Sequence, residues 1–425
     1  MGPPVGCGRS TLTVDAGLSI YTRRVTSLEP DTNVDRAPSA GPGAAAAPLV
    51  LRAPSGGEVR VDIPVVLAPM AGITNPAYRQ LCREQGAGLY VCEMITSRGI
   101  IENDAKTLSM LQFDPGETVR SVQLYGVDPE VMGQGAKILC EDFEVAHIDL
   151  NFGCPVPKVT RKGGGGVLPY KRDRLRAICS AVVEAADAYG VPVTIKTRKG
   201  IDADHLTYID AGHIAQETGV AAIALHGRTV SQAYSGQADW DSIAHLVREV
   251  DIPVLGNGDI WEATTALDMV ERTGCDGVVV GRGCLGRPWL FRDLAEAFAG
   301  GRVQHLPTLG EVAAMVRRHA ELLADLMGEE RGLTDLRKHM SWYFKGFPVG
   351  GEIRRGLGLV SSFADLDAQL ARLDADAPYP RQELGSPRGR QGSPRERVVM
   401  PEGWLADTCG MDLDLAAAES DVSGG

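Results

Sequence analysis

The chain has 425 residues, of which 44% are hydrophobic and 23% are charged, a composition typical of a soluble globular protein. The formal net charge of −12 argues on its own against a nucleic-acid partner, but half of it lies in the last 25 residues, which carry six acidic side chains and no Lys or Arg. No apolar run approaches the roughly 18 residues that a membrane span needs. The alanine-rich stretch near residue 45 lacks the apolar core of a secretory signal, so we expect a cytoplasmic protein that contacts no membrane.

The nine cysteines form no C-x-x-C pair, and their number is odd. This pattern argues against both a disulfide framework and a zinc ribbon. We therefore expect free thiols, most of them small core residues, and no bound metal.

The two ends of the chain lack the periodicity of helices and strands. Residues 1–58 are rich in Pro, Gly, Ala and Ser, and a stretch rich in Pro, Arg and Gly fills residues 377–397. Such compositions bury too little apolar surface to fold. We predict a flexible N-terminal segment at residues 1–58 and a flexible C-terminal tail at residues 376–425.

Eight short apolar runs lie between these ends, and each is nearly continuous instead of alternating with polar residues. They are PVVLAPM at 64, GLYVCEM at 88, SVQLYG at 121, AHIDLNFGC at 146, PVTIKTR at 192, AIALHGR at 222, PVLGNGD at 253 and GVVVGRG at 277. Continuous runs are typical of strands that are covered on both faces, and amphipathic helical segments separate them. Eight such units predict an α/β fold, a (β/α)8 TIM barrel over residues 59–303. An open doubly wound sheet is less favoured, because the first turn, APMAGITNPAY, lacks the G-x-G-x-x-G fingerprint.

After GRPWLF the pattern changes to helices alone, which predicts a small all-helical domain at residues 304–375. Cations cluster at two places in the chain. Residues 155–176 hold seven Lys or Arg against one Asp, and residues 331–355 hold six against two acidic residues. Such clusters either contact nucleic-acid phosphates or form a solvated helix face, and charge alone does not decide between these two interpretations.

TIM barrels place their active sites at the carboxyl ends of the strands, so the residues that close each apolar run are the informative ones. In chain order they are Met70, Glu93, Gln123, Asn151 with Cys154, Lys196, His226, Asn257 with Asp259, and Gly281 with Arg282. A barrel with a purely structural role would not need this series. The sequence therefore predicts a binding site at this end of the barrel.

Three of these residues suggest a flavin that carries a phosphate. Arg282 follows the eighth run, where many barrels bind phosphate through backbone N–H groups, although a simple tight turn is the alternative. Lys196 would point into the barrel mouth and needs an anion, either a protein carboxylate or the N1–C2 region of a reduced flavin. His226 could donate a hydrogen bond to the cofactor or its phosphate, or serve a structural role.

Cys154 lies in a turn between Asn151 and Pro155 that presents its thiol at a strand end. A cysteine in this place can be a nucleophile, a metal ligand, a general acid or an inert buried residue. No second metal ligand of suitable spacing lies near it in the sequence. With an ordinary pKa of about 8.5 the thiol is mostly protonated at neutral pH, so it could act as a general acid.

Eight longer motifs carry a family resemblance. In chain order they are APMAGITNPAYR, VQLYG, HIDLNFGCPVPKVTRKGGGG, TIKTRKG, LHGRTVSQAYSGQADW, LGNGDI, GVVVGRGCLGRPW and RKHMSWYFKGFPVGGE. Together they resemble the tRNA-dihydrouridine synthases, most closely their bacterial B-type branch, from about residue 60 to 375. One departure is Asn75, where many relatives have Asp, and both residues can cap the following helix.

The resemblance implies an enzyme that reduces specific uridines of tRNA to 5,6-dihydrouridine. It would combine an FMN-binding barrel with a helical tRNA-binding domain, use NADPH or NADH as electron donor, and act as a monomer. Hydride would pass from FMN to C6 of uracil while Cys154 donates a proton to C5. The target base would have to flip out of its stack to reach the flavin.

The resemblance also assigns the other candidate residues. Those expected to bind FMN are Ala68, Pro69, Met70, Gln123, Lys196, His226, Asn257, Gly258, Asp259, Gly281 and Arg282. Those expected to bind tRNA are Glu93, Asn151, Lys158, Arg161, Lys162, Arg198, Lys338, Lys345, Arg354 and Arg355.

Two other classes of function stay open. An FMN-dependent oxidoreductase of a small substrate, in the manner of dihydroorotate dehydrogenases, would share the phosphate site and the strand-end lysine but has no use for a basic helical domain. A phosphate-binding barrel without redox chemistry, or a plain RNA-binding module, would need no flavin. Bound flavin excludes the last class, and the dihydrouridine content of tRNA separates the other two.

Overall fold

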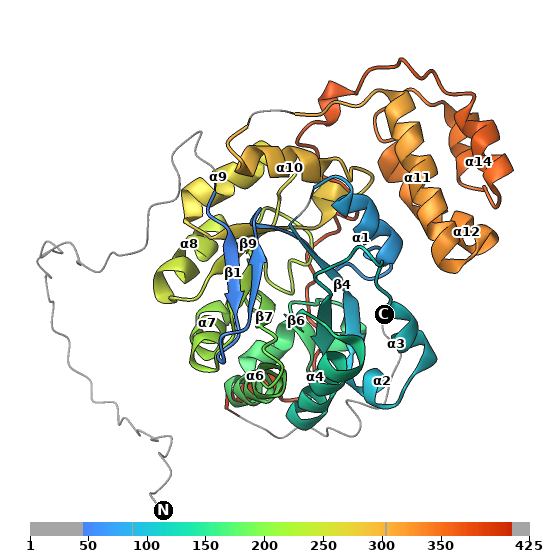
Figure 1. The fold of residues 1–425 in the computed structure, drawn as a ribbon. Helices are drawn as coiled ribbons and strands as arrows, with labels where there is room; N and C mark the ends of the chain where they lie inside the picture. The colour runs from blue at the N-terminus through green and yellow to red at the C-terminus, as the bar shows by residue number, and fades with distance from the viewer. Residues whose placement is uncertain (1–45, 87, 302–303, 410–425) are drawn as a thin grey trace, which may run out of the picture. The chain divides into compact units, whose positions relative to one another are not determined.

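The structure, a computed structural model, describes residues 46–86, 88–301 and 304–409 (Figure 1). All described residues belong to one compact unit. The outer parts of the two predicted flexible segments, residues 1–45 and 410–425, lie outside the described residues.

Eight parallel strands close into a barrel, and each comes from one of the eight apolar runs. They are β3 (Val65–Leu67), β4 (Leu89–Thr96), β5 (Ser121–Tyr125), β6 (His147–Phe152), β7 (Val193–Arg198), β8 (Ala222–His226), β9 (Val254–Asn257) and β10 (Gly277–Val280). Each strand pairs with the next one in the chain, and β10 closes the ring by pairing with β3. Almost every strand residue is buried, because helices cover the outside of the ring while side chains fill its inside. The TIM-barrel prediction is confirmed, and the open sheet is excluded.

Helices between the strands cover the outer face of the barrel (Figure 1). Those in the described residues are α1 (Pro76–Arg83), α2 (Ser97–Ile101), α3 (Ala105–Met110), α4 (Pro129–Phe143), α5 (Pro157–Thr160), α6 (Arg172–Asp187), α7 (Tyr208–Glu217), α8 (Trp240–Glu249), α9 (Ala263–Thr273) and α10 (Leu290–Phe298), with the 3₁₀ turns η1 (Gly165–Tyr170) and η2 (Arg282–Cys284). Capping residues fix where they begin. The Asp128 side chain accepts hydrogen bonds from the N–H groups that open α4, and the Asn75 side chain does the same for Tyr78 in α1. Asn75 therefore caps its helix as expected.

Four further helices form the predicted helical domain: α11 (Leu309–Met327), α12 (Glu329–Tyr343), α13 (Gly351–Leu357) and α14 (Phe363–Leu370). Helices α11 and α12 pack so closely that a Cβ atom on Gly332 would lie 2.7 Å from the backbone of Leu323. Helix α11 also packs on α1 of the barrel, where Arg318 forms an ion pair with Glu84 at 2.6 Å. The domain is thus joined to the barrel by direct packing.

Two strands that the sequence does not predict close the amino-terminal end of the barrel. β1 (Leu49–Arg52) and β2 (Glu58–Val61) form an antiparallel hairpin. Leu49, Leu51, Val59 and Val61 are buried in one cluster with side chains from the barrel interior, such as Val66. The expectation of a flexible segment up to residue 58 is therefore wrong for residues 49–58, because their alternating apolar side chains seal the floor of the barrel.

The expected flexible C-terminal tail is likewise wrong for residues 378–409, here called the C-terminal strap. It contains the short 3₁₀ turns η3 (Arg381–Glu383) and η4 (Trp404–Ala406). Arg388 and Trp404 are buried. The Arg388 guanidinium donates a hydrogen bond to the Trp342 carbonyl at 2.7 Å, and the Trp404 indole donates to the Val167 carbonyl at 3.1 Å. Long-range polar contacts therefore order a segment whose composition has no secondary-structure period.

All eight cysteines of the described residues are free thiols, and six of them are buried, as the sequence predicts. None of the helices in the described part of the chain combines the length and the apolarity that a membrane crossing requires.

Candidate active site

A cavity of about 480 Å³ opens at the carboxyl ends of the barrel strands. Residues at the ends of all eight strands line it, from Ala68 after β3 to Gly281 after β10. Its volume lies within the range of pockets that hold cofactors and substrates, roughly 300–1,000 Å³. The strand-end prediction therefore locates the main pocket of the described structure.

Sixteen of the residues that the sequence singles out line this cavity. They are Ala68, Pro69, Met70, Gln123, Asn151, Cys154, Lys158, Lys162, Lys196, Arg198, His226, Asn257, Gly258, Asp259, Gly281 and Arg282. Six do not, namely Glu93, Arg161, Lys338, Lys345, Arg354 and Arg355.

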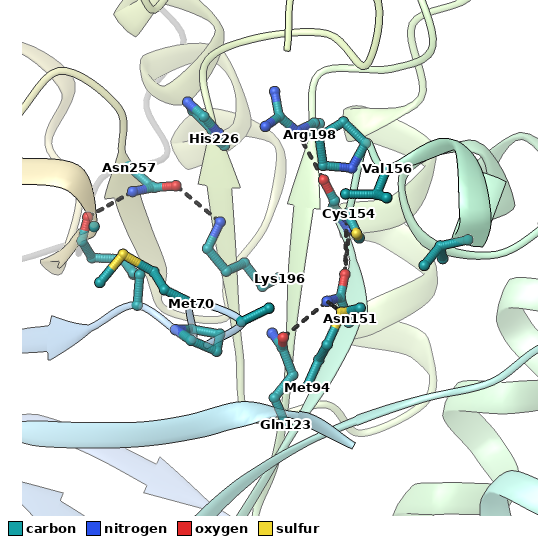
Figure 2. Close-up of a pocket in the computed structure, with 18 of the residues that line it drawn as sticks. Met70, Met94, Gln123, Asn151, Cys154, Val156, Lys196, Arg198, His226 and Asn257 are labelled. Carbon is teal, nitrogen blue, oxygen red and sulfur yellow. Dashed lines mark hydrogen bonds between the residues drawn. The ribbon is translucent and has the colours of Figure 1, made fainter. Parts of the chain in front are cut away.

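A chain of hydrogen bonds joins the floor of the pocket to the turn that carries Cys154 (Figure 2). Buried Asp149 accepts a hydrogen bond from the Gln123 amide at 2.7 Å, and Gln123 in turn accepts one from the Asn151 amide at 2.8 Å. The Asn151 side-chain oxygen accepts the N–H groups of Gly153 at 3.1 Å and Cys154 at 2.9 Å. Asn151 therefore fixes the turn, and its expected contact with the substrate stays a prediction.

The glycine run behind Cys154 lets a second stretch of backbone pack against this turn. The N–H of Gly166 donates to the Cys154 carbonyl at 3.0 Å. Gly165 has a φ of +58°, and a Cβ there would lie 2.6 Å from the same carbonyl oxygen. A side chain at either position would collide, since a Cβ on Gly166 would meet Val230 at 2.4 Å.

The Cys154 thiol is half-buried, and burial raises its pKa above the ordinary value. The backbone N–H of Val156 and the charges of Arg198, Arg395 and Lys196 oppose this effect. The thiol is therefore protonated at neutral pH. The three cationic side chains stabilise the thiolate that forms when it loses its proton.

Lys196 donates a hydrogen bond to the side-chain oxygen of Asn257 at 2.9 Å, and the Asn257 amide is itself held by the Val279 carbonyl at 2.7 Å (Figure 2). Among the described residues no carboxylate forms an ion pair with this lysine. Burial, reinforced by the charge of Arg198, lowers the pKa of Lys196 to about 8. The alternative of a lysine paired with a protein carboxylate is therefore not what the structure contains.

Arg282 lies between two aromatic rings, 4.8 Å from the Tyr234 centroid and 5.2 Å from the Trp261 centroid. It donates a hydrogen bond to the Arg390 carbonyl at 2.6 Å, and it lies 3.8 Å from an Asp259 oxygen. That oxygen, Oδ1, is buried and has no hydrogen-bond partner in the described residues. The turn thus holds a clamped guanidinium beside an acceptor that is left for a ligand hydroxyl.

His226 is buried beside Arg228, whose guanidinium lies 3.5 Å from the ring. Burial, together with the charge of Arg198, lowers the pKa of His226 well below its ordinary value. The ring is therefore neutral at pH 7 and has one N–H to donate.

The charges around the pocket are strongly unbalanced. Within the described residues its lining holds one carboxylate, Asp259, against the cationic side chains of Lys158, Lys162, Lys196, Arg198, Arg282 and Arg390. A protein with a net charge of −12 thus concentrates positive charge at one mouth. Such a pocket favours anionic ligands.

The remaining expected tRNA contacts fall into two groups. Lys345 and Arg354 serve the fold, because Lys345 bonds Glu383 and Ser386 while Arg354 donates to two backbone carbonyls. The other group, Arg161, Lys338 and Arg355, is exposed.

Two further candidates, Glu93 and Arg198, form hydrogen bonds with backbone groups of neighbouring loops. Glu93 accepts the N–H of Gly72 in the loop after β3. Arg198 donates through Nε and Nη1 to the carbonyls of Gly153, Thr229 and Ala233, and it also lines the cavity.

Sequence reasoning missed several residues of the site, among them four that contact Arg282 or Asp259. Tyr234 and Trp261 stack on Arg282, Arg228 bonds Asp259 at 2.8 Å, and Arg390 reaches the pocket from the C-terminal strap. The first three follow strand ends and could have been found there. No pattern in the sequence marks Arg390.

Comparisons with known proteins agree on one family. The model of the dihydrouridine synthase (Dus) family matches residues 66–377. A probable tRNA-dihydrouridine synthase of Mycobacterium tuberculosis strain H37Rv is 53% identical over 359 residues, which cover 83% of this chain and 92% of that protein. The tRNA-dihydrouridine synthase B of Escherichia coli K12 is 36% identical over 321 residues, 75% of this chain and 97% of that protein.

Among solved structures, histamine dehydrogenase from Rhizobium sp. 4-9 superposes with a TM-score of 0.47 at 11% identity, over 76% of this chain and 64% of that one. The family match spans well over half of the chain and includes nearly all of the barrel strands, the pocket lining except Arg390, and helices α11 to α14. The chain therefore belongs to the dihydrouridine synthase family.

Proposed function

We propose that this protein is an FMN-dependent tRNA-dihydrouridine synthase that reduces the C5–C6 bond of specific uridines in tRNA. The observation that carries the proposal is the position of Cys154. Its protonated thiol shares one cation-rich pocket with Lys196 and with the Arg282 clamp, and the names of the relatives supply the substrate.

The residues present suit FMN. Lys196 lacks a carboxylate partner and matches an anionic ring edge, with the Gln123 and Asn257 amides beside it. Arg282 suits the phosphate, and the Oδ1 of Asp259, which accepts no hydrogen bond among the described residues, suits a hydroxyl of the ribityl chain. When bound, FMN supplies the hydride for C6 of uracil after accepting electrons from NADPH or NADH.

Cys154 would give its proton to C5 of the bound uracil. Burial keeps this proton on the thiol until a base arrives. Afterwards Arg198 and Lys196 stabilise the thiolate, and Asn151 keeps the sulfur in place through two backbone N–H groups. A preorganised acid is worth roughly 10²–10⁴ in rate.

The tRNA approaches from the pocket mouth, where Lys158 and Lys162 of the glycine-rich loop face the cavity. Arg161, Lys338 and Arg355 offer exposed cations for neighbouring phosphates. Since the cavity lies inside the barrel mouth, the target uridine would have to flip out of its stack to enter it. We extend the proposal to a monomer in the cytoplasm, where tRNA is modified.

The test is complementation of a bacterial strain that lacks dihydrouridine in its tRNA. Expression of this chain should restore dihydrouridine, measured by mass spectrometry of digested tRNA, and the purified protein should be yellow. A yellow protein that restores none would be an FMN oxidoreductase of a small substrate. A colourless protein that cannot be reconstituted with FMN would refute the flavin assignment.

A further inference from the structure

The C-terminal strap crosses the candidate active site, although it lies beyond residues 66–377 that match the family model. It is anchored on both sides of the pocket. Before the crossing, buried Arg388 is bonded to the helical domain at Trp342. After it, the Leu405 carbonyl accepts from the Tyr170 hydroxyl at 3.2 Å, and Trp404 bonds Val167. The stretch between these anchors therefore has a fixed path.

The first contact of this stretch is with Arg282, the residue proposed to bind the FMN phosphate. Arg282 donates to the carbonyl of Arg390 at 2.6 Å. Gly389 permits this approach, because its φ is +67° and a Cβ there would lie 2.8 Å from Leu285. The strap thus limits the positions that the Arg282 guanidinium can take.

The second contact is with the Cys154 turn, on the other side of the same pocket. The Arg395 guanidinium donates to the carbonyl of Pro155, the residue next to Cys154. Its own backbone N–H donates to the Ser231 carbonyl at 2.8 Å, so Arg395 is held at both ends. Removing its side chain would leave the Pro155 carbonyl without this donor.

The charges that face the Cys154 sulfur come from two elements. Lys196 and Arg198 approach from β7, and Arg395 approaches from the strap. Lys158 and Lys162 line the same cavity from the glycine-rich loop. Arg395 is the member of this set that lies outside the family match.

We propose that Arg395 is a positioning residue for the Cys154 acid, and that the C-terminal strap completes the active site of this chain. The inference rests on the proposed role of Cys154 in proton donation. Arg395 holds the turn through Pro155, and its charge stabilises the thiolate that remains after the proton has moved from sulfur to C5 of the base.

The first test needs no tRNA. The Cys154 thiol is alkylated with iodoacetamide over a range of pH, and the modified peptide is quantified by mass spectrometry. In Arg395→Met the midpoint of the alkylation profile should move to higher pH, with about a tenfold lower rate below it for each pKa unit. Arg395→Lys should restore the midpoint because it keeps the charge. Arg397→Met, an exposed arginine two residues on, is the matched control and should not move it.

The second test uses the complete enzyme with NADPH and tRNA. Arg395→Met should slow oxidation of the reduced flavin by tRNA roughly tenfold, while reduction of the flavin by NADPH is unchanged. An unchanged alkylation midpoint in Arg395→Met, or the same shift in Arg397→Met, would overturn the inference. Alkylation of Cys154 does not depend on uridine reduction. A wild-type protein without activity on tRNA would therefore refute the proposed function, whereas the shift of the alkylation midpoint in Arg395→Met would still decide whether Arg395 acts on the Cys154 thiol.

Discussion

Replacing Lys196 with methionine should stabilise the apoprotein while weakening its hold on FMN. Burial lowers the pKa of Lys196 from its ordinary value of 10.5 to about 8. Each pKa unit corresponds to about 1.4 kcal/mol, so charge on this lysine costs the apo fold about 3 kcal/mol at neutral pH. Methionine removes this cost but also the hydrogen bond to Asn257, worth about 1 kcal/mol. The expected net gain in unfolding free energy is about 1–2 kcal/mol.

The size of this stability gain depends on pH in a defined window. Below pH 8 the lysine is charged in both the folded and the unfolded protein, so the full cost is present. Between about 8 and 10.5 the unfolded chain binds the proton more tightly than the folded one, and the wild type becomes more stable as pH rises. The advantage of Lys196→Met should therefore shrink across this window.

Urea unfolding of the two apoproteins at neutral pH and near pH 10 measures the difference, and FMN titration measures binding. Lys199→Met is the matched control, because Lys199 pairs with Asp239 and its replacement should destabilise. FMN should bind Lys196→Met at least tenfold more weakly, the equivalent of about 1.4 kcal/mol for one lost charged contact. A variant that is less stable than wild type at neutral pH would refute the assignment of Lys196 as a buried charge awaiting an anion.

Cys154→Ala should slow oxidation of the reduced flavin by tRNA about 10²–10⁴-fold, while reduction of the flavin by NADPH is unchanged, and Cys154→Ser should behave alike. Rapid mixing measures the two steps separately, and equal slowing of both would instead indicate a damaged cofactor site. Asn151→Ala should lower the unfolding free energy by about 1–3 kcal/mol in urea titrations, because two turn N–H groups lose their acceptor. Affinity for tRNA in filter binding should fall steeply with salt, less so in a Lys158→Ala, Lys162→Ala double variant, and a flat response would contradict phosphate contacts. Leu51→Ala should cost about 2–5 kcal/mol, seen as a lower melting temperature, whereas a residue in a flexible segment would cost nothing.

The barrel could be predicted because each of its strands has a pattern that can be recognised within a few consecutive residues. Each strand lies in a short run that is rich in apolar residues, which is typical of strands that are buried on both faces. The strand-end rule then located most of the pocket, since closure of the barrel brings these ends together. Position alone did not predict every contact: Arg198 lines the cavity as expected of a residue that contacts tRNA, and its Nε and Nη1 also donate to backbone carbonyls, which the sequence did not predict.

The parts that escaped prediction depend on distant contacts. Strands β1 and β2 have four residues each, too few for a clear period, and they are stabilised by the barrel floor that they cover. Arg388 is buried because the Trp342 carbonyl accepts its hydrogen bond, a partner 46 residues away. The composition of the C-terminal strap indicates that it does not fold alone. It does not indicate that contacts with a neighbouring surface order the strap.

The β1–β2 hairpin has a consequence for the order of events in catalysis. By sealing the amino-terminal end of the barrel, it leaves the described pocket with access from the carboxyl end only. An electron donor and a flipped base would then use the same opening, and we expect them to compete for it. The enzyme should therefore alternate between them, releasing the oxidised nicotinamide before the tRNA binds. Initial rates measured against both substrates should give parallel double-reciprocal lines.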